Sequence, residues 1–473
     1  MSDWLWTHDE AEKATGGTST APWNARGVAF DSRAVVDDDL FVALEGETSD
    51  GHGYVMQAFR NGAAAALVER RPEIAESAGP LLVVVNTSEG LDRLARAARA
   101  RTGARIAAVT GSVGKTGTKD ALRHVLSRQG LTYASEKSFN NHVGTPLSLA
   151  RMPRGAAWGV FEVGTNAPGE IGPLAALVRP HVALITNVES VHSGNFAGEA
   201  AIAAEKAAIF DALEPGGVAV INADNRHAAS LMSHATTVGA GRVVRFGTSA
   251  DADVRLLSLR ADGAGSLVEA SVEGRTVKYR LALAGRHQAL NSLGVLAVVH
   301  HLGADVAAAA AALGDIVPLA GRGVRHEIAV AGGSALLIDE SYNASPVALR
   351  AALDVLAETP AGKGGRRIAV LGDMLELGDT AVAQHIALAA EVERKRIDLV
   401  FAVGPLMNRL YGQLQSARRG GAAGDARGIA ALLSSVIRPG DVVLVKGSRR
   451  IGLEAVVEAL AVNEVPVHAD ASA

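Results

Sequence analysis

The residues with the clearest chemical potential lie in the stretch 106–120, IAAVTGSVGKTGTKD. Its apolar start, Ile106 to Val109, predicts a buried strand, and a helical pattern begins at Lys115. Backbone N–H groups in a glycine turn of this kind point at an anion, and the helix N-terminus adds partial positive charge. Lys115 would then reach the terminal phosphates of a nucleotide, while the Thr116 hydroxyl would hold Mg²⁺.

This turn is shorter than the usual phosphate-binding loop. A strict P-loop has a glycine five positions before Gly114, and this chain has Val109 there. The alternative is therefore a plain glycine turn with an incidental lysine. The order of strand, glycine turn, Lys-Thr pair and helix favours the nucleotide site.

Further polar side chains are expected at the carboxyl ends of neighbouring strands. Glu162 ends the apolar run Trp158 to Val163, and His192 follows the run Val182 to Val188. With Thr116 they would supply a carboxylate, an imidazole and a hydroxyl, which suit Mg²⁺. A buried acid needs a partner that offsets its desolvation, so Glu162 is the stronger candidate. The alternative for His192 is a loop histidine without a ligand.

Other polar clusters are candidates for substrate contacts. Asp31-Ser32-Arg33 would suit a diphosphate, and its alternative is simple turn chemistry. The loop 140–146, NNHVGTP, is richer in amides than a turn requires. Two more clusters follow strands in the last third of the chain: Asp339, Glu340, Tyr342 and Asn343, and then Lys446, Gly447, Ser448, Arg449 and Arg450. Lys206, in the helical pattern AIAAEKAAIF, would by itself be a surface lysine.

The strands and helices expected around these residues indicate an α/β protein of three domains, which comprise residues 1–102, 103–318 and 319–473. The middle domain alternates strands and helices, which predicts a mostly parallel sheet with its ligand at the strand carboxyl ends. From Val243 to Leu283 the apolar residues recur with period two, which predicts an antiparallel edge.

The last domain is expected to be doubly wound. Its predicted elements are a strand ending at Asp339, a helix from Pro346, strands at Ile368 to Leu371, Leu399 to Val403 and Val442 to Lys446, a helix through His385 and a helix from Ile451.

Composition excludes several classes of protein. A chain of 473 residues exceeds one ordinary core, and 48% hydrophobic with 20% charged residues is typical of a folded protein. The net charge of -4 shows no excess of basic residues, so nucleic acid is not expected as a partner. The absence of cysteine excludes disulfides and thiolate metal sites. Neither a secretory signal nor a membrane span is found, so we expect a cytoplasmic protein, and a monomer.

Several motifs occur together in one order, and through them the chain resembles the Mur ligases. TGSVGKTGTKD is similar to the short nucleotide loop of this family, which accounts for the missing glycine. FEVGTN, TNVESVH, AEKAAIF, GRHQALNSL and GRG follow in the expected sequence. DSRAVVDDDLFVALEG, NNHVGTPLSL, IDESYNASPVAL, LGDMLELGD and VLVKGSRR resemble the members that add D-alanyl-D-alanine to UDP-N-acetylmuramoyl-tripeptide.

The resemblance implies a fold and two cofactors. It implies a small N-terminal α/β domain for the UDP substrate, a central P-loop ATPase-like domain and a C-terminal Rossmann-like domain. It also implies ATP and Mg²⁺. The nucleotide would contact Thr110, Gly111, Ser112, Val113, Gly114, Lys115, Thr116, Gly117, Asn291, Arg322 and Asp339. The metal ligands would be Thr116, Glu162, His192 and Lys206, the lysine after carbamylation by CO₂.

Two further residue sets come from the same resemblance. The catalytic groups would be Lys115, Glu162, His192 and Lys206. The small-molecule substrates would contact Ser32, Arg33, Asn140, Asn141, Thr145, Tyr342, Asn343, Lys446, Ser448 and Arg449. The chain departs from the pattern at Gln288, where many relatives have Asn, and this leaves the role of Asn291 unchanged.

The activity implied is ATP-dependent amide formation through an acyl phosphate, in the synthesis of a peptidoglycan precursor. The nearest alternative is a sister ligase that adds a single amino acid, or one that adds glutamate to folate. An alternative of another class is a P-loop nucleotide switch or motor, although no guanine-reading NKxD-type segment is present. A non-enzymatic scaffold would leave GSVGKT, Glu162 and Lys206 together without a reason.

Overall fold

The computed structural model describes residues 4–46, 49–70, 79–136, 139–189, 195–263 and 265–461. The chain forms two compact units. The first contains Met1–Thr186, Ala203–Arg245 and Ala297–Ala309, and the second contains Asn187–Ile202, Phe246–Leu296 and Ala310–Ala473.

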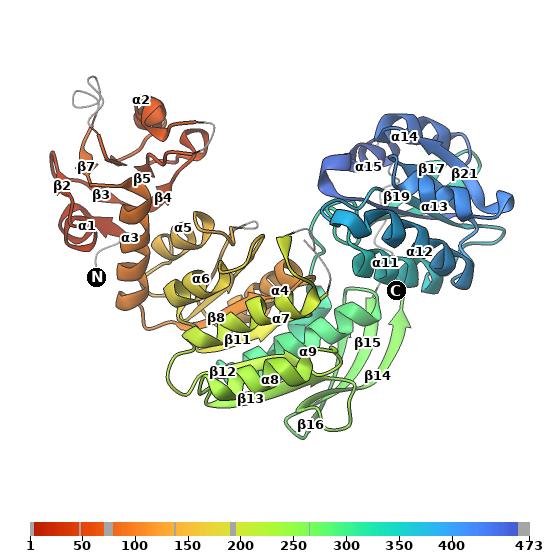
Figure 1. Cartoon of the computed structure of the whole chain (residues 1–473), viewed down its shortest axis with the longest axis horizontal. Coiled ribbons are helices and arrows are strands. Elements are labelled where there is room, and N and C mark those ends of the chain that lie inside the picture. The colour runs from red at the N-terminus through yellow and green to blue at the C-terminus, as the bar shows by residue number, and fades with distance from the viewer. Residues whose placement is uncertain are drawn as a thin grey trace, which may run out of the picture. The chain divides into compact units, whose positions relative to one another are not determined.

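The N-terminal part of the first unit is built on a five-stranded sheet of order β2-β7-β6-β5-β4 (Figure 1). The strands are β2 (Thr18–Ser19), β4 (Gly27–Ala29), β5 (Asp39–Val42), β6 (Ala65–Val68) and β7 (Leu81–Val83), with a separate pair of β1 (Trp6–Thr7) and β3 (Asn24–Ala25). Strands β4 to β7 are parallel, as expected for the small α/β domain. The helices are α1 (His8–Thr15), α2 (Val55–Arg60) and α3 (Thr87–Arg101).

A longer sheet follows, with the order β13-β12-β11-β8-β10-β9, in which β8, β9, β10, β11 and β12 pair in parallel. Its strands are β8 (Arg105–Thr110), β9 (Thr132–Ala134), β10 (Trp158–Glu162), β11 (Val182–Ile185), β12 (Val218–Asn222) and β13 (Arg242–Gly247). Its helices are α4 (Lys115–Ser127), α5 (Gly144–Ala150), α6 (Ile171–Val178), α7 (Glu199–Ala207) and α8 (Ala228–Thr237). Figure 1 shows β8, β11, β12 and β13 side by side. The predicted strand from Val182 ends at Ile185, because the chain then turns into the site described below.

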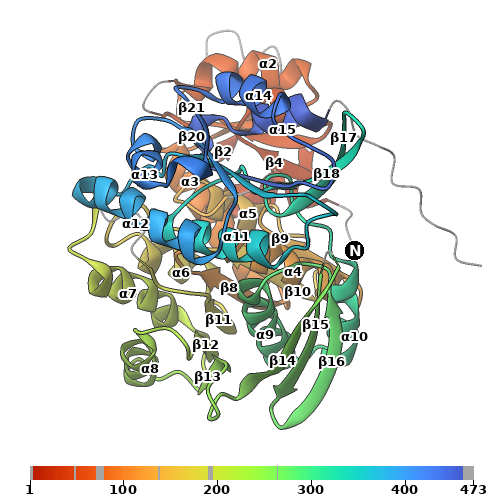
Figure 2. The same cartoon turned by 90° about the vertical axis from the view of Figure 1, so that its right-hand side faces the viewer.

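The antiparallel edge consists of β14 (Val254–Asp262), β15 (Gly265–Val272) and β16 (Arg275–Leu281), adjacent in Figure 2. The prediction was wrong for β13, which pairs in parallel with β14 through Phe246 and Val254. Glu273 and Gly274, with φ of 48° and 82°, form the turn between β15 and β16. Two helices follow, α9 (Arg286–His301) and α10 (Val306–Ala312).

The C-terminal sheet has the order β17-β18-β22-β19-β20-β21. The strands are β17 (Val324–Val330), β18 (Gly333–Asp339), β19 (Arg367–Gly372), β20 (Leu399–Val403), β21 (Arg419–Ala423) and β22 (Val442–Lys446). All neighbours are parallel except β17, which forms an antiparallel hairpin with β18 where the sequence predicted one strand.

Helices cover both faces of this sheet, which confirms the doubly wound prediction. They are α11 (Pro346–Glu358), α12 (Ala381–Arg394), α13 (Met407–Gln413), α14 (Ala426–Ser434) and α15 (Glu454–Ala461). Alternate residues of β19 point to opposite cores: Ala369 and Leu371 pack with α11, α12 and α13, while Ile368 and Val370 pack with α14 and α15. The helix predicted from Ile451 begins at Glu454, after a short 3₁₀ turn.

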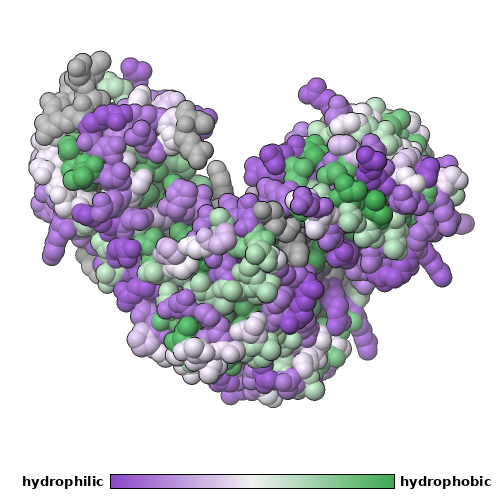
Figure 3. Space-filling view, viewed as in Figure 1, coloured by the Kyte–Doolittle hydropathy of each residue, from purple (hydrophilic) through white to green (hydrophobic). Residues whose placement is uncertain are grey.

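The outer surface carries both hydrophilic and apolar residues. Figure 3 shows hydrophilic residues on the visible face, interspersed with smaller apolar patches. In the described part of the chain, no helix has both the length and the apolar character needed to cross a membrane.

Candidate active site

The glycine turn has the predicted structure of a phosphate cradle. Strand β8 ends at Thr110, and helix α4 begins at Lys115. Gly114, with φ of 85°, is the N-cap of α4, and a side chain there would strain the left-handed backbone. Because the N-cap of α4 is a glycine, it supplies no capping side chain, and the first-turn N–H groups point toward the place of an anion. The Lys115 ammonium donates to the Gly111 carbonyl at 2.7 Å.

Glu162 lies beside the start of this turn. Strands β10 and β8 pair Glu162 with Val109, one residue before Thr110. The Glu162 side chain is buried, and its Oε1 accepts a hydrogen bond from Asn140 Nδ2 at 2.7 Å. A Cβ at Gly164 would lie 2.7 Å from the Asn140 amide carbon, so glycine permits this contact. The partner that a buried acid requires is therefore Asn140.

The second carboxylate oxygen of Glu162 has a different environment. Oε2 is buried and has no hydrogen-bond partner among the described residues. A buried acceptor without a donor is a site where an ion or ligand is expected. A carboxylate oxygen and the Thr116 hydroxyl at the start of α4 are hard oxygen donors, which fit Mg²⁺.

Lys206 is not the surface lysine that its isolated helical pattern suggested. Its side chain on α7 is only 3% exposed. Burial, together with the positive charge of Lys115, lowers the pKa of Lys206 to about 7. An amine with this pKa is largely neutral at slightly alkaline pH, and is therefore nucleophilic.

Sequence reasoning missed the residue that fixes α7. Both carboxylate oxygens of Glu205 accept backbone hydrogen bonds, from Gly169 N at 2.7 Å and Ile171 N at 2.8 Å. These donors lie in the segment that follows Glu162 and begins α6. Glu205 thereby holds the helix of Lys206 against the loop after β10. The only sequence signal was its place next to Lys206.

Other predicted residues can be compared with the structure, except His192, which lies outside the described residues. Asn141 Oδ1 caps α5 by accepting from Gly144 N at 2.9 Å, and the buried Thr145 hydroxyl has no partner among the described residues. Ser32 donates to Gln57 at 3.1 Å, while the exposed Arg33 pairs with Asp31.

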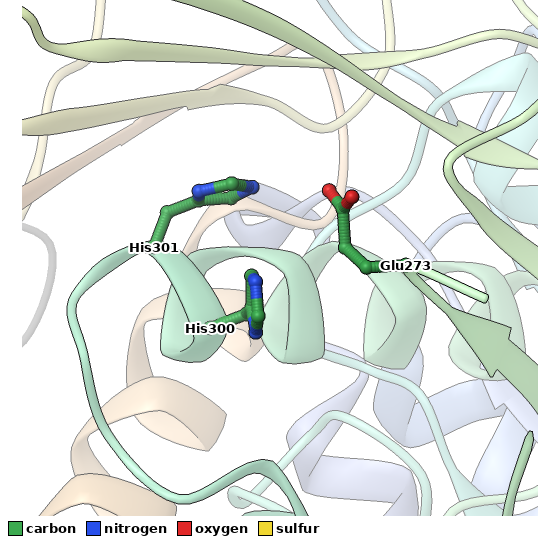
Figure 4. A group of neighbouring side chains, drawn as sticks. All are labelled: Glu273, His300 and His301. Atoms are coloured by element: carbon green, nitrogen blue, oxygen red, sulfur yellow. The ribbon is translucent and has the colours of Figure 1, made fainter. Parts of the chain in front are cut away.

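The carboxyl end of α9 contacts the strand that leads to the phosphate cradle. His300 and His301 end α9 with their rings edge to face, 4.9 Å apart (Figure 4). Arg105, the first residue of β8, donates to the His301 carbonyl at 3.1 Å. Glu273, also labelled in Figure 4, belongs to the turn between β15 and β16. The hydrogen bond to the His301 carbonyl therefore links the end of α9 to β8.

In the second unit, the predicted polar clusters at the ends of β18 and β22 lie together. The Asp339 carboxylate is buried and accepts from Gly321 N at 2.9 Å, Ser341 N at 3.0 Å and Ser341 Oγ at 2.6 Å. The buried Lys446 ammonium donates to Glu340 Oε2 and to the Asn343 carbonyl, each at 3.0 Å.

An aromatic side chain between two arginines lies next to this cluster. The guanidiniums of Arg322 and Arg449 are 4.1 and 5.1 Å from the centre of the Tyr342 ring. Arg449 also donates to the Tyr342 hydroxyl at 3.1 Å. Ser448, buried next to Arg449, accepts from Leu375 N at 2.9 Å.

Arg322 also lines a cleft of the second unit. Its other lining residues are Ala282, Leu283, Ala284, Gln288, Gly323, Arg325, Ile338, Glu340 and Val355. Asn291, half-buried, lies one helical turn after Gln288 on α9. The cleft therefore combines a helix residue from the GRHQALNSL motif with the linker arginine.

Comparison with known proteins agrees with this arrangement. Three family profiles match in order: the Mur ligase family, catalytic domain, at residues 24–99; the Mur ligase middle domain at 109–299; and the Mur ligase, glutamate ligase domain, at 324–449.

Two curated relatives are similar over nearly their whole length, both named UDP-N-acetylmuramoyl-tripeptide--D-alanyl-D-alanine ligase. That of Rickettsia prowazekii is 30% identical, covering 96% of this chain and 99% of the relative. That of Escherichia coli is 33% identical, covering 92% and 94%.

Solved structures extend the likeness to the fold. A crystal structure of MurF from Acinetobacter baumannii has a TM-score of 0.85 and 28% identity, covering 96% of this chain and 98% of that one. MurF ligase from Thermotoga maritima, solved in complex with ADP, has a TM-score of 0.78 and 27% identity, covering 93% and 98%. This chain therefore belongs to the Mur ligase family.

Proposed function

We propose that this chain is an ATP-dependent ligase that adds D-alanyl-D-alanine to UDP-N-acetylmuramoyl-tripeptide, a step of peptidoglycan precursor synthesis. The observation that carries the chemistry is the phosphate cradle of Lys115 beside the buried, half-satisfied carboxylate of Glu162. The relatives named above support the choice of substrates. ATP and a UDP-linked substrate are cytoplasmic metabolites, so we place the reaction in the cytoplasm.

The chemistry explains why a phosphate cradle is needed. A carboxylate does not react with an amine, because the anion repels the nucleophile and offers no leaving group. Transfer of the γ-phosphoryl group to a carboxylate oxygen of the tripeptide releases ADP and forms an acyl phosphate. The amine of D-alanyl-D-alanine then attacks the acyl carbon, the C–O bond to phosphate breaks, and the amine loses a proton.

Lys115 and the turn amides have a defined task in this reaction. Two anions, the triphosphate and the peptide carboxylate, must approach each other. The Lys115 ammonium, the N–H groups after Gly111 and the N-terminus of α4 would hold the phosphates and offset this repulsion. Such preorganised donors are each worth on the order of 3 kcal/mol in a transition state.

Mg²⁺ fits the donor set next to the cradle. Glu162 Oε2, the Thr116 hydroxyl, His192 and Lys206 are the residues we propose to hold it. When bound, Mg²⁺ would neutralise part of the charge on the phosphate oxygens. Asn140 would keep the Glu162 carboxylate in one orientation, since it holds Oε1 and leaves Oε2 available.

Lys206 suits the carbamylation that the family resemblance implies. Carbamate formation needs a neutral amine, and the pKa of about 7 supplies one at neutral to alkaline pH. The reaction joins the amine nitrogen to the carbon of CO₂ with loss of a proton. It replaces a buried cation near Lys115 by an anion, which removes the repulsion between the two lysines and adds an oxygen ligand.

A phosphate-release assay tests the function. UDP-N-acetylmuramoyl-tripeptides with different third residues are supplied with ATP and Mg²⁺. We expect release only when D-alanyl-D-alanine is added, and no stimulation by single amino acids. Stimulation by one amino acid would instead identify a sister ligase. ATP hydrolysis that is independent of every acceptor would favour a nucleotide switch.

A further inference from the structure

Thr186, the first residue of the TNVESVH motif, was given no role by the sequence but contacts the phosphate cradle. Thr186 follows β11, and its N–H donates to the Thr110 carbonyl at 3.0 Å, which extends the pairing of β8 and β11 by one step. Its side chain is only 1% exposed. The hydroxyl donates to the Val113 carbonyl at 2.6 Å and lies 3.3 Å from the Thr110 carbonyl. Thr186 therefore contacts the cradle near both of its ends.

The bond to Val113 determines how the cradle presents its N–H groups. The described residues contain no cis peptide, so the Val113 carbonyl and the Gly114 N–H lie on opposite sides of one rigid peptide plane. When Thr186 holds the carbonyl, the Gly114 N–H must point away from Thr186. Gly114 itself has the conformational freedom of glycine, so without this bond the plane could rotate. A rotated plane would present a carbonyl dipole to the phosphates instead of a donor.

Thr186 is itself held by a third strand end. Asn222, the last residue of β12, donates from Nδ2 to the Thr186 carbonyl at 3.0 Å. The Oδ1 atom of Asn222 accepts from Asp224 N at 3.0 Å, so the amide orientation is fixed. The hydrogen bonds thus run from β12 through Thr186 to the Val113–Gly114 peptide.

We propose that Thr186 is a positioning residue of the nucleotide site, which keeps the Gly114 N–H directed at the phosphates of ATP or ADP. The proposal rests on the proposed function in one respect only, that the cradle binds a nucleotide phosphate. It predicts a loss of nucleotide affinity when the hydroxyl is removed, with the affinity for the UDP-linked peptide and the dipeptide unchanged.

The isosteric change Thr186→Val tests this, with the dissociation constant of ADP measured by calorimetry. Loss of one buried hydrogen bond predicts a rise of about tenfold in that constant. The KM for ATP should rise in parallel, while the KM values for the two other substrates stay within about twofold. Thr186→Ser keeps the hydroxyl and should restore ADP binding to near the wild-type value.

Thr15→Val is the matched control. Thr15 is also buried in the first unit, and its hydroxyl donates to the Ala11 carbonyl of its own helix. This variant should lose stability but keep the wild-type affinity for ADP. Asn222→Ala, which leaves the Thr186 hydroxyl in place, provides a second test and should raise the dissociation constant by about threefold.

The outcomes separate the two proposals. A wild-type chain that does not bind ADP would contradict the proposed function. A wild-type chain that binds ADP, with Thr186→Val and Asn222→Ala binding equally well, would overturn the role of Thr186 alone. The role of Thr186 would also be overturned if Thr15→Val raised the dissociation constant of ADP as much as Thr186→Val does. The rise would then follow from lost stability.

Discussion

The phosphate cradle of the first unit and the polar cluster of the C-terminal sheet are both built at the carboxyl ends of parallel strands, yet they differ in how their polar atoms are satisfied. Near the cradle, Glu162 Oε2 and the Thr110 hydroxyl are buried without a partner among the described residues. In the C-terminal cluster, Asp339, Lys446 and Ser448 are all hydrogen-bonded.

This difference separates a site that awaits a ligand from one that holds the chain together. Leaving a buried polar atom unpaired costs free energy, and a fold retains such atoms where a bound group satisfies them. Asp339 instead binds the linker at Gly321, and Ser448 binds the loop at Leu375. We therefore propose that the groups of the C-terminal cluster that bind a ligand are the less buried ones, Tyr342 and Arg449.

The largest effect is expected from Lys115→Ala. Removing the cation that faces the phosphates should lower ATP-dependent phosphate release by about a thousandfold. The Lys115 ammonium donates to backbone carbonyls of its own turn, those of Gly111 at 2.7 Å and Ser112 at 3.5 Å. The unfolding midpoint in urea should therefore change little. Retained turnover in a folded variant would place the nucleotide elsewhere.

Glu162→Gln should have the next largest effect. The amide keeps the size of the side chain and an oxygen for Asn140, but it removes the negative charge that Oε2 offers to Mg²⁺. We expect phosphate release to fall by about a hundredfold, with partial recovery at high Mg²⁺ concentration. An Mg²⁺ titration of the rate measures this. The reading of Oε2 as a metal ligand fails if the titration curve of the variant matches that of the wild type.

Much of the cradle could be predicted from the sequence, because its residue types are diagnostic. A buried apolar run, two glycines and a Lys-Thr pair have few other uses, and Glu162 in an apolar strand needed a partner. Thr186 and Glu205 lie within the TNVESVH and AEKAAIF motifs, but their residue types did not indicate a role. Their importance depends on which distant backbone atoms they meet, Val113 for one and Ile171 for the other, and that is set by the tertiary fold.

The prediction of the strands was limited in the same way, by contacts that only the tertiary fold sets. Strands with several branched apolar residues, such as β8 and β22, were predicted almost to the residue. Strand β21, Arg419–Ala423 with the sequence RGGAA, was missed because glycine and alanine have little preference for strands. It is a strand because β20 offers it an edge. The burial of Lys206 was missed for a similar reason, since its helical pattern alone does not show what covers the helix.

The amount of carbamate on Lys206 is expected to depend on pH, and this effect is smaller than the two above. With a pKa of about 7, the amine is mostly neutral at pH 8 and mostly protonated at pH 6. At a fixed concentration of dissolved CO₂, the carbamate should therefore fall by more than about tenfold from pH 8 to pH 6, because its formation consumes the neutral amine and also releases a proton. The carbonyl signal of ¹³C-labelled carbamate, absent in Lys206→Arg, measures it. Equal signals at both pH values would contradict the proposed modification.

Asp339→Asn should change activity least, and it tests the comparison directly. The amide loses a charge-assisted acceptor for Gly321 or Ser341, so the free energy of unfolding should fall by about 2 kcal/mol. Asp373→Asn is the matched control, because the buried Asp373 likewise binds backbone N–H groups, those of Leu406 and Met407.

If the C-terminal cluster serves mainly to hold the linker, both variants should be destabilised and both should bind ADP within about twofold of the wild type. The family resemblance makes the opposite prediction for Asp339, a contact with the nucleotide. A rise in the ADP dissociation constant for Asp339→Asn, with none for Asp373→Asn, would show that a fully hydrogen-bonded carboxylate still reaches the ligand. The contrast between the two regions would then be one of degree, since satisfied atoms would exchange their partners when the nucleotide binds.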